Sequence, residues 1–270
     1  MKQVLSIQSS VAAGFVGNTV AGPVLTALGQ HPLLVDTVLL AAHPGYGKRA
    51  GGAVPDSILA DVLDGILTLT DTAGMHIVTS GYLGSAGQAA GIAALVDGWR
   101  GASGGTYILD PVLGDGGRLY VAQDIADAMR AELLPRADII TPNHYELSWL
   151  SDRDVTGRAD TAAAAAGLID RHGLGAVIVT GVADGSLTGD LLVGADGATM
   201  WQPADEAGKN VAGGGDLLTA LLAGLLSLGR PLPDAFKAAS RTAQSVIAAS
   251  PDGRDLALLE SLEAVRALAR

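Results

Sequence analysis

Val211-Ala212-Gly213-Gly214-Gly215-Asp216 is the stretch that decides how this sequence is interpreted, and it runs directly into the apolar segment Leu217–Leu226. Three successive glycines allow the backbone to turn sharply and to point several N–H groups into one concavity. The helix predicted to follow adds its own unpaired N–H groups and the positive end of its dipole. The turn and the helix start together form a candidate site for phosphate oxygens.

Asp216 is the candidate catalytic residue of this turn. A carboxylate at the helix start would lie beside a transferred phosphate and could accept a proton from a substrate hydroxyl. The alternative is structural, with Gly213–Gly215 as a flexible turn and Asp216 as an ordinary helix cap. The turn is not a Walker A loop, because no Gly-Lys-Ser/Thr sequence ends it. A catalytic role for Asp216 therefore needs support from the rest of the chain.

Outside this turn, short β-branched runs alternate with amphipathic stretches, which is typical of a mostly parallel sheet covered by helices. Helices are predicted near 58–67, 86–99 and 161–171, the first after Pro55. The C-terminal third adds helical segments beginning near Gly215, Pro233 and Asp255. We predict one α/β domain over residues 1–270. The expected strands are Val4–Gln8, Leu33–Leu40, Met75–Ser80, Thr106–Asp110, Asp138–Thr141 and Ala176–Thr180, with two short ones near Leu191–Val193 and Thr199–Trp201.

Composition excludes several classes of protein. Of the 270 residues, 49% are apolar and 17% are charged, a balance too hydrophobic for disorder. No apolar run reaches the length of about eighteen residues that a membrane span needs, and the N-terminal apolar stretch is too short for a signal peptide. The absence of cysteine favours a cytoplasmic protein and leaves no thiolate metal site.

The net charge of −11 argues against a nucleic acid partner, because phosphate backbones are bound by basic patches. It also means that an anionic ligand must be held by local donors against an unfavourable overall field. Small molecules are therefore the expected partners, with neither nucleic acid nor membrane.

Four further motifs follow predicted strands, where open α/β sheets bind their ligands. Gln8–Asn18 (QSSVAAGFVGN) leads from a strand into a helix and offers the Ser9 hydroxyl, although Asn18 could also be a simple N-cap. The others are Ser80–Gly84 (SGYLG), Asp110–Asp115 (DPVLGD) and Thr141–Glu146 (TPNHYE). Their carboxylate and amide oxygens could converge at one edge of the sheet, and oxygen ligands suit Mg²⁺.

These motifs, taken in order, resemble the ribokinase-like superfamily and, within it, the family of vitamin B6 (pyridoxal) kinases. The order QSxVxxGxxGN, TVxxxxHxxYG, SGYLG, DPVxGD, TPNxxE and GxGD runs from near residue 4 to about residue 225. Each motif is weak alone, but six in order are a strong signal. The resemblance implies a three-layer fold with helices on both faces of the sheet. It also implies ATP-dependent phosphorylation of the 5′-hydroxyl of pyridoxal, with pyridoxine and pyridoxamine as further candidate substrates.

The resemblance assigns expected roles to particular residues. Asp216 would be the base, and the amides of Gly213, Gly214 and Gly215 would form the anion hole. The residues expected to bind the substrate are Asp216 at the 5′-hydroxyl, Ser9, Val16 and Tyr82 at the pyridine ring, and His43 at the edge of the ring pocket. Asp110 and Glu146 would bind Mg²⁺. The residues expected to bind ATP are Asp110, Thr141, Asn143, Glu146, Thr180, Trp201, Gln202, Gly213 and Gly215.

Further expectations come from the resemblance alone. They are a monovalent cation such as K⁺ and a homodimer. The residues themselves predict a mobile lid over about 43–52, because four of the ten residues of His43–Gly52 are glycine. Three departures from the family pattern bear on the choice of vitamer. Gly214 and Pro44 stand where threonine is common, and Ala41-Ala42 replace Ser-Asn before His43.

Two alternative functions stay open at this stage. A kinase of a related alcohol such as hydroxymethylpyrimidine would share the flat ring and the hydroxymethyl group. A sensor of vitamin B6 or nucleotide would bind the same ligands without turnover, but it would have no need of the base Asp216.

Overall fold

The computed structural model describes residues 2–70, 72–204, 211–251 and 254–270. Its strands are β1 (Gln3–Ala13), β2 (His31–Ala42), β3 (Gly51–Ala53), β4 (Met75–Ser80), β5 (Thr106–Leu109), β8 (Ile139–Ile140), β9 (Ala176–Asp184), β10 (Leu187–Gly194) and β11 (Thr199–Pro203), with a separate ribbon of β6 (Gly114–Asp115) and β7 (Arg118–Leu119). The main sheet has the order β11-β10-β9-β8-β5-β4-β1-β2-β3. Strands from β9 to β2 are parallel, and antiparallel strands lie at both ends, so the predicted mostly parallel sheet is confirmed.

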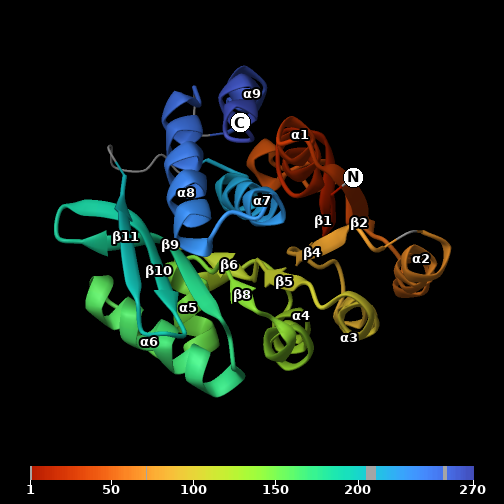
Figure 1. Ribbon diagram of the computed structural model, residues 1–270, viewed down its shortest axis with the longest axis horizontal. Helices are drawn as coiled ribbons and strands as arrows, with labels where there is room; N and C mark the ends of the chain where they lie inside the picture. The colour runs from red at the N-terminus through yellow and green to blue at the C-terminus, as the bar shows by residue number, and fades with distance from the viewer. Residues whose placement is uncertain (1, 71, 205–210, 252–253) are drawn as a thin grey trace.

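Helices cover both faces of this sheet, which passes between them (Figure 1). On one face lie α1 (Asn18–Ala27), α7 (Gly214–Ser227), α8 (Leu232–Ala249) and α9 (Leu258–Ala267); on the other lie α2 (Asp56–Leu69), α3 (Gly87–Ser103), α4 (Gln123–Ala128), α5 (His144–Ser151) and α6 (Gly157–His172). Short 3-10 turns (Pro44–Tyr46 and Leu134–Arg136) and a π-helical turn (Met129–Leu133) connect them. The expected three-layer arrangement is confirmed.

The uninterrupted apolar runs of the central strands follow from this layering. Successive side chains of a strand point to opposite faces, and here both faces are covered. Ile77 packs in the core under α7, whereas its neighbour Val78 packs in the core over α3. Ile108 and Leu109 divide in the same way. Both cores therefore draw on every central strand.

Strand register brings the predicted motifs to one edge. Parallel pairing aligns Ile7 with Ser80, Ser80 with Leu109, and Leu109 with Ile140 in one row across β1, β4, β5 and β8. The motifs begin at or directly after this row, with Ser80 in the row and Gln8, Asp110 and Thr141 following it. The predicted convergence of the motifs at one edge of the sheet is thus confirmed.

Several predicted boundaries are wrong in an instructive way. Strand β1 does not end at Gln8 but continues to Ala13 after a register shift between Gln8 and Ser10, so Ser9 lies inside the strand. The last helix begins at Leu258 rather than near Asp255. The segment expected as a lid, 43–52, contains a 3-10 turn and the start of β3, and its mobility stays a prediction. Such short or irregular elements carry too few residues for a period to be recognised.

Within the described part of the chain, no helix combines the length and the apolar character required to cross a bilayer.

Candidate active site

A cavity of about 890 Å³ opens at the carboxyl ends of β5, β8 and β9, between β10–β11 and helices α7–α8. This is the place where open α/β sheets bind ligands. The residues of the predicted site that line it are Asp110, Thr141, Asn143, Glu146, Thr180, Gln202 and Gly213–Asp216. Residues 8 to 16, 43 and 82 do not line it.

The glycine turn forms one wall of this cavity. Gly213 has φ +88° and is the N-cap of α7. A Cβ at Gly213 would lie 2.1 Å from the carbonyl oxygen of Phe15, so the turn packs directly on the backbone of the loop between β1 and α1. Gly215 is exposed to the cavity. The turn therefore leaves the first N–H groups of α7 facing open space.

Asp216 lies in the first turn of α7 and faces the same cavity. Desolvation raises the pKa of its carboxyl, while a hydrogen bond from the backbone N–H of Gly17 lowers it. The side chain is neither packed into the core nor remote from the strand ends. A carboxyl with a raised pKa at the mouth of an amide-lined turn can accept a proton from a bound hydroxyl.

Asp110 is buried directly after β5. Its pKa is raised well above the usual value by desolvation and by the negative charges of Asp216 and Glu146. Its Oδ2 accepts a hydrogen bond of 3.2 Å from the Thr219 hydroxyl, which is 2.8 Å from the Thr141 hydroxyl. Since Thr219 donates to Asp110, Thr141 donates to Thr219. Thr141, Thr219 and Asp110 thus form a chain of two hydrogen bonds, and its two ends, Thr141 and Asp110, line the cavity.

Glu146 and Asn143 form a capping box at the start of α5. The Glu146 carboxylate accepts N–H bonds from Asn143 at 2.8 Å, Leu113 at 2.9 Å and Gly114 at 3.4 Å. Burial nevertheless raises its pKa to about 8. The Asn143 side chain accepts from the Glu146 N–H and donates to the Gly114 carbonyl. Both residues thus hold the 110–115 turn against α5 as well as lining the cavity.

Asp190, at the opposite end of the cavity, is a polar residue that the sequence did not single out. Its carboxylate accepts hydrogen bonds from Ser240 at 2.5 Å, Gln244 at 3.2 Å and the Gly181 N–H at 3.2 Å. Burial raises its pKa, and these donors oppose that rise. Asp190 therefore fastens β9–β10 to α8. The only advance signal was the spacing of four between Ser240 and Gln244, which places them on one helix face.

The neighbouring residues Trp201 and Gln202 separate because they point to opposite faces of β11. Gln202 lines the cavity, and its carbonyl accepts from Gln244 at 3.4 Å. Trp201 lies outside the lining, packed against the core under α6, with the Arg158 guanidinium 5.4 Å from its ring. The structure therefore separates Trp201 from the other residues expected at the nucleotide.

Of the residues expected at the substrate ring, Ser9 and His43 contact the loop from β1 to α1, and Val16 lies in it, whereas Tyr82 follows β4. A Cβ at Gly17 would lie 2.4 Å from the Ser9 hydroxyl. Tyr82 comes two residues after the row that pairs Ile7 with Ser80, and its hydroxyl accepts from Arg49 at 3.4 Å. Ser9 packs on Gly17, whose N–H is hydrogen-bonded to Asp216 at the cavity.

Asn18 is not the N-cap of α1, because Gly17 occupies that position. Its buried side chain instead accepts from the Ser6 hydroxyl at 2.8 Å and donates to Asp36 at 2.7 Å. The amide thereby ties α1 to β1 and β2. Sequence alone could not distinguish this role from capping, because both use the same polar atoms.

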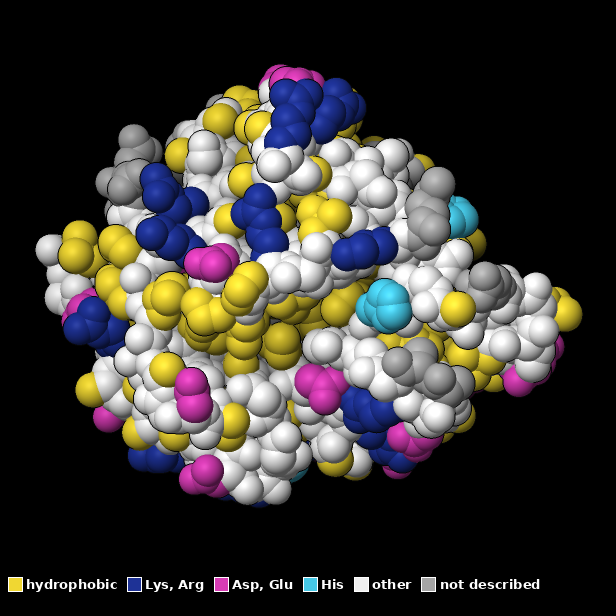
Figure 2. Space-filling view, in the orientation of Figure 1, with side chains coloured by type: hydrophobic (Ala, Val, Ile, Leu, Met, Phe, Trp, Pro, Cys, Tyr) yellow, Lys and Arg dark blue, Asp and Glu magenta, His cyan; other side chains and the backbone are white. Residues whose placement is uncertain are grey.

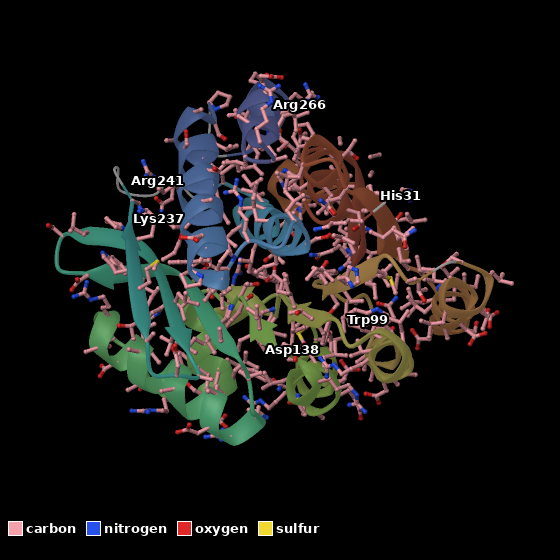
Figure 3. All side chains as sticks on the ribbon, in the orientation of Figure 1. His31, Trp99, Asp138, Lys237, Arg241 and Arg266 are labelled. Atoms are coloured by element: carbon pink, nitrogen blue, oxygen red, sulfur yellow. The ribbon has the colours of Figure 1, made fainter. Side chains whose placement is uncertain are left out.

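The cavity is acidic, and its described residues include one arginine, Arg241, but no lysine. Arg241 projects from α8 on the side of β11 (Figure 3). Lys and Arg side chains gather over α8 and α9 on the same face of the molecule (Figure 2). His144 also lines the cavity, although no pattern in the sequence singled it out. An anion in this site would rely on backbone amides and on few side-chain cations.

Oxygen atoms are the available ligands for a metal ion here. Among residues 2–70, 72–204, 211–251 and 254–270, no group of three or more His, Cys, Asp or Glu side chains is arranged so that it could hold a metal ion by itself. Mg²⁺ needs no such group, since one or two carboxylates and bound phosphates usually hold it. Asp110 accepts a hydrogen bond from Thr219 and keeps further lone pairs, and its pKa is raised by burial and then by the negative charges of Asp216 and Glu146. The donor set fits Mg²⁺.

Comparison with known proteins identifies the family. The model of the phosphomethylpyrimidine kinase family matches residues 23–256. The pyridoxine/pyridoxal/pyridoxamine kinase of Bordetella avium is 38% identical over 246 residues, covering 88% of this chain and 82% of the relative. The chain belongs to this kinase family.

Solved structures of kinases share the fold. Pyridoxal kinase from Entamoeba histolytica superposes with a TM-score of 0.91 at 26% identity, covering 99% of this chain and 96% of that one. Pyridoxal kinase from Leishmania donovani, in complex with ADP and pyridoxamine, gives 0.88 at 28% identity, covering 98% and 96%. The resemblance to vitamin B6 kinases and the ribokinase-like fold are confirmed, and the protein is a kinase.

Proposed function

We propose that this kinase transfers the γ-phosphoryl group of ATP to the 5′-hydroxyl of pyridoxal, with pyridoxine and pyridoxamine as further substrates. The observation that carries the proposal is the position of Asp216. Its carboxylate faces the cavity beside the Gly213–Gly215 turn and the start of α7. The relatives named for pyridoxal and the complex with ADP and pyridoxamine support this choice of substrates.

Asp216 acts as the base in this proposal. It takes the proton of the 5′-hydroxyl as the oxygen attacks the γ-phosphorus in line with the leaving ADP. Burial raises its pKa, and the hydrogen bond from the Gly17 N–H opposes that rise. A general base works best when its pKa lies near the operating pH. General base catalysis contributes about 10²- to 10⁴-fold in rate.

The glycine turn supplies the anion hole. Backbone N–H groups at Gly213–Gly215 are fixed by the turn and need no reorganisation when charge develops on the phosphoryl oxygens. Loss of one such donor costs about 3–4 kcal/mol of barrier stabilisation in well-studied cases. The positive end of the α7 dipole acts in the same direction.

Asp110 and Glu146 would hold Mg²⁺ in this proposal. When bound, the ion neutralises charge on the phosphates and orients them. Glu146 already accepts three backbone hydrogen bonds, so Asp110 would be the carboxylate with more free lone pairs for a cation. Thr141 supports Asp110 through Thr219.

The nucleoside part of ATP would lie toward Thr180, Gln202 and Arg241, at the end of the cavity away from the glycine turn. The B6 ring would lie against Ser9, Val16, His43 and Tyr82. Ser9 packs on Gly17, and the Gly17 N–H is hydrogen-bonded to Asp216. The nucleotide part and the B6 part of the site would therefore meet at the Asp216 carboxylate.

A turnover assay tests this function. The purified chain is incubated with ATP, Mg²⁺ and each vitamer, and the 5′-phosphate and ADP are measured by mass. We expect equal amounts of both products. A folded protein that binds pyridoxal and ATP but makes neither product would instead be a sensor.

A pyrimidine alcohol is the second candidate substrate, favoured by the family model, which is that of phosphomethylpyrimidine kinase. Hydroxymethylpyrimidine offers a flat heteroaromatic ring and the same hydroxymethyl group. With both alcohols present in one reaction, the ratio of the two phosphorylated products decides between them. We expect pyridoxal to be preferred.

A homodimer is also part of the proposal. Strand β3 pairs only with Val38–Leu40 of β2, so the outer edge of the earlier half of β2 has no strand beside it in the described chain. Leu34 and Leu39 on β2 and Ile58 and Val62 on α2 are 44–57% exposed. An exposed strand edge beside apolar side chains favours coverage by a second copy.

We further propose a requirement for K⁺, a mobile lid over 43–52 and a cytoplasmic location. A requirement for K⁺ is checked by replacing it with tetramethylammonium in the assay. Motion of the 43–52 lid is checked by hydrogen exchange with and without ligands. A cytoplasmic location, favoured by the absence of cysteine, is checked by cell fractionation.

A further inference from the structure

We propose that Asp255, in the segment between α8 and α9, is a positioning residue for the substrate side of the active site. It would act by holding His43 and Tyr46, and through them the loop from β1 to α1. We call these contacts the Asp255 bridge. The inference rests on the proposed function, because it concerns the B6 side of that site.

Two side chains from the 43–46 segment converge on one carboxylate. The His43 Nε2 lies 3.1 Å from Asp255 Oδ1, and the Tyr46 hydroxyl donates to Oδ2 at 2.6 Å. The Gly45 N–H donates to His43 Nδ1 at 3.1 Å. Since Nδ1 is thereby an acceptor, Nε2 carries the hydrogen and donates to Asp255. Each oxygen of the carboxylate has its own donor.

Arg254 completes the bridge from the outside. Its guanidinium lies 4.6 Å from the centre of the Tyr46 ring, and its Nε lies 3.4 Å from Asp255 Oδ2. The rings of His43 and Tyr46 meet edge to face at 5.0 Å. The 43–46 segment is therefore clasped by residues more than two hundred positions away in the chain.

The Asp255 bridge contacts the loop between β1 and α1, and this loop in turn contacts Asp216. A Cβ at Gly14 would lie 2.6 Å from His43 Cδ2 and 2.8 Å from Asp255 Oδ1, so both side chains rest against the Gly14 backbone. In the same loop, the Phe15 carbonyl packs on Gly213 and the Gly17 N–H donates to Asp216. Asp255 thus sets the position of His43 directly and borders the loop that contacts Asp216.

The position of the Asp255 bridge lets its effect on the vitamer be distinguished from an effect on ATP. Asp255, His43 and Tyr46 do not line the cavity assigned to ATP. Loss of the bridge should therefore release the 43–46 segment and weaken binding of the vitamer, while the walls of the nucleotide end, fastened by Asp190, stay in place. A purely structural weakening would affect both substrates.

The test compares the wild type with Asp255→Ala, Asp255→Asn and the exposed control Asp61→Asn. We expect Asp255→Ala to raise KM for pyridoxal about tenfold, as loss of hydrogen bonds to a charged group implies, with KM for ATP within about twofold. Asp255→Asn keeps one acceptor oxygen and should give an intermediate KM. Asp61→Asn should match the wild type.

Hydrogen exchange gives a readout that does not depend on turnover. Amides of 43–47 should exchange faster in Asp255→Ala than in the wild type, with no change in α7. Turnover by the wild type tests the proposed function, and the contrast between variants tests the bridge. The inference would be overturned if Asp255→Ala and the wild type had the same KM for pyridoxal. It would also be overturned if the KM values for pyridoxal and ATP rose in parallel, or if exchange in 43–47 were unchanged.

Discussion

At the scale of single residues, the chemistry depends on carboxylates that the fold has partly removed from water. Asp110, Glu146 and Asp216 all have raised pKa values, each chiefly because burial disfavours the charged form. Close to one another they repel, so a cation and the phosphates that accompany it are natural complements. The same burial that raises the pKa of the base also makes the ionised carboxylates unfavourable to the folded protein when no ligand is bound.

Replacing Asp216 by Asn removes the proposed base but keeps the shape of the side chain. We expect kcat to fall about 10²- to 10⁴-fold, because general base catalysis is lost, while the dissociation constant for ATP changes little. Steady-state kinetics and calorimetric titration with a nonhydrolysable ATP analogue measure the two quantities. Asp61→Asn is the matched control. Unchanged turnover would remove Asp216 from the mechanism.

Glu146 should make stability depend on pH. Its pKa is raised to about 8 by burial, so between its unfolded value and about 8 the native state binds a proton that the unfolded state releases. The free energy of unfolding should therefore fall as the pH rises from about 5 to about 8, by about 1–4 kcal/mol.

Urea unfolding of Glu146→Gln checks this without added Mg²⁺. The variant cannot titrate at this position, so its loss of stability over the same pH range should be smaller than in the wild type. Some slope should remain from Asp110 and Asp216, whose pKa values are also raised. Parallel curves for the two proteins would contradict the assignment.

At the scale of elements, the site depends on how the start of α7 packs on the loop between β1 and α1. The apolar periodicity of α7 makes the helix, but Gly213 decides where it begins. Its φ of +88° and its contact with the Phe15 carbonyl tolerate no side chain. The loop and the helix start are therefore fixed to one another by backbone contacts.

Gly213→Ala and Gly215→Ala form a matched pair for this packing. At Gly213 the new Cβ would lie 2.1 Å from a backbone oxygen, whereas at Gly215 the nearest atom is the Asp110 Oδ2 at 4.0 Å. We expect Gly213→Ala to destabilise the protein by about 1–3 kcal/mol or more. Gly215→Ala should leave stability unchanged within about 1 kcal/mol.

Urea denaturation and circular dichroism compare the two alanine variants with the wild type. Similar losses at both positions would mean that the contact between Gly213 and Phe15 does not limit the turn.

At the scale of the whole molecule, the net charge of −11 leaves anion binding to local donors, and the edge of the sheet near β2 leaves apolar side chains in solvent. Leu39 on β2 is 57% exposed, and Leu259 on α9 is 60% exposed. The two leucines differ in their surroundings: Leu39 lies on β2, directly after the half of that strand whose outer edge has no strand beside it in the described chain, whereas Leu259 lies on helix α9.

Leu39→Glu should therefore convert the proposed dimer to a monomer, because it would bury a charge at the interface. Leu259→Glu should leave the oligomeric state of the wild type unchanged. Sedimentation velocity over a range of concentrations measures both. A monomeric wild type, or a dimer that survives Leu39→Glu, would contradict the proposed surface.

The sequence by itself determined the layered α/β fold and the edge at which the motifs meet, because apolar periodicity and residues after strand ends are local patterns. It also pointed to Asp216, whose glycine turn and helix lie side by side in the chain. The lengths of β1 and of the short elements could not be predicted, since a register shift and two-residue strands leave no period.

Only the tertiary structure decided the partners of the site residues. Asp190 meets Ser240 and Gln244, and Asp255 meets His43, across separations of 50 to 212 residues. Trp201 leaves the cavity because its neighbour Gln202 takes the inward face of β11. Such pairings depend on how elements pack in three dimensions, and no local preference of the chain specifies them.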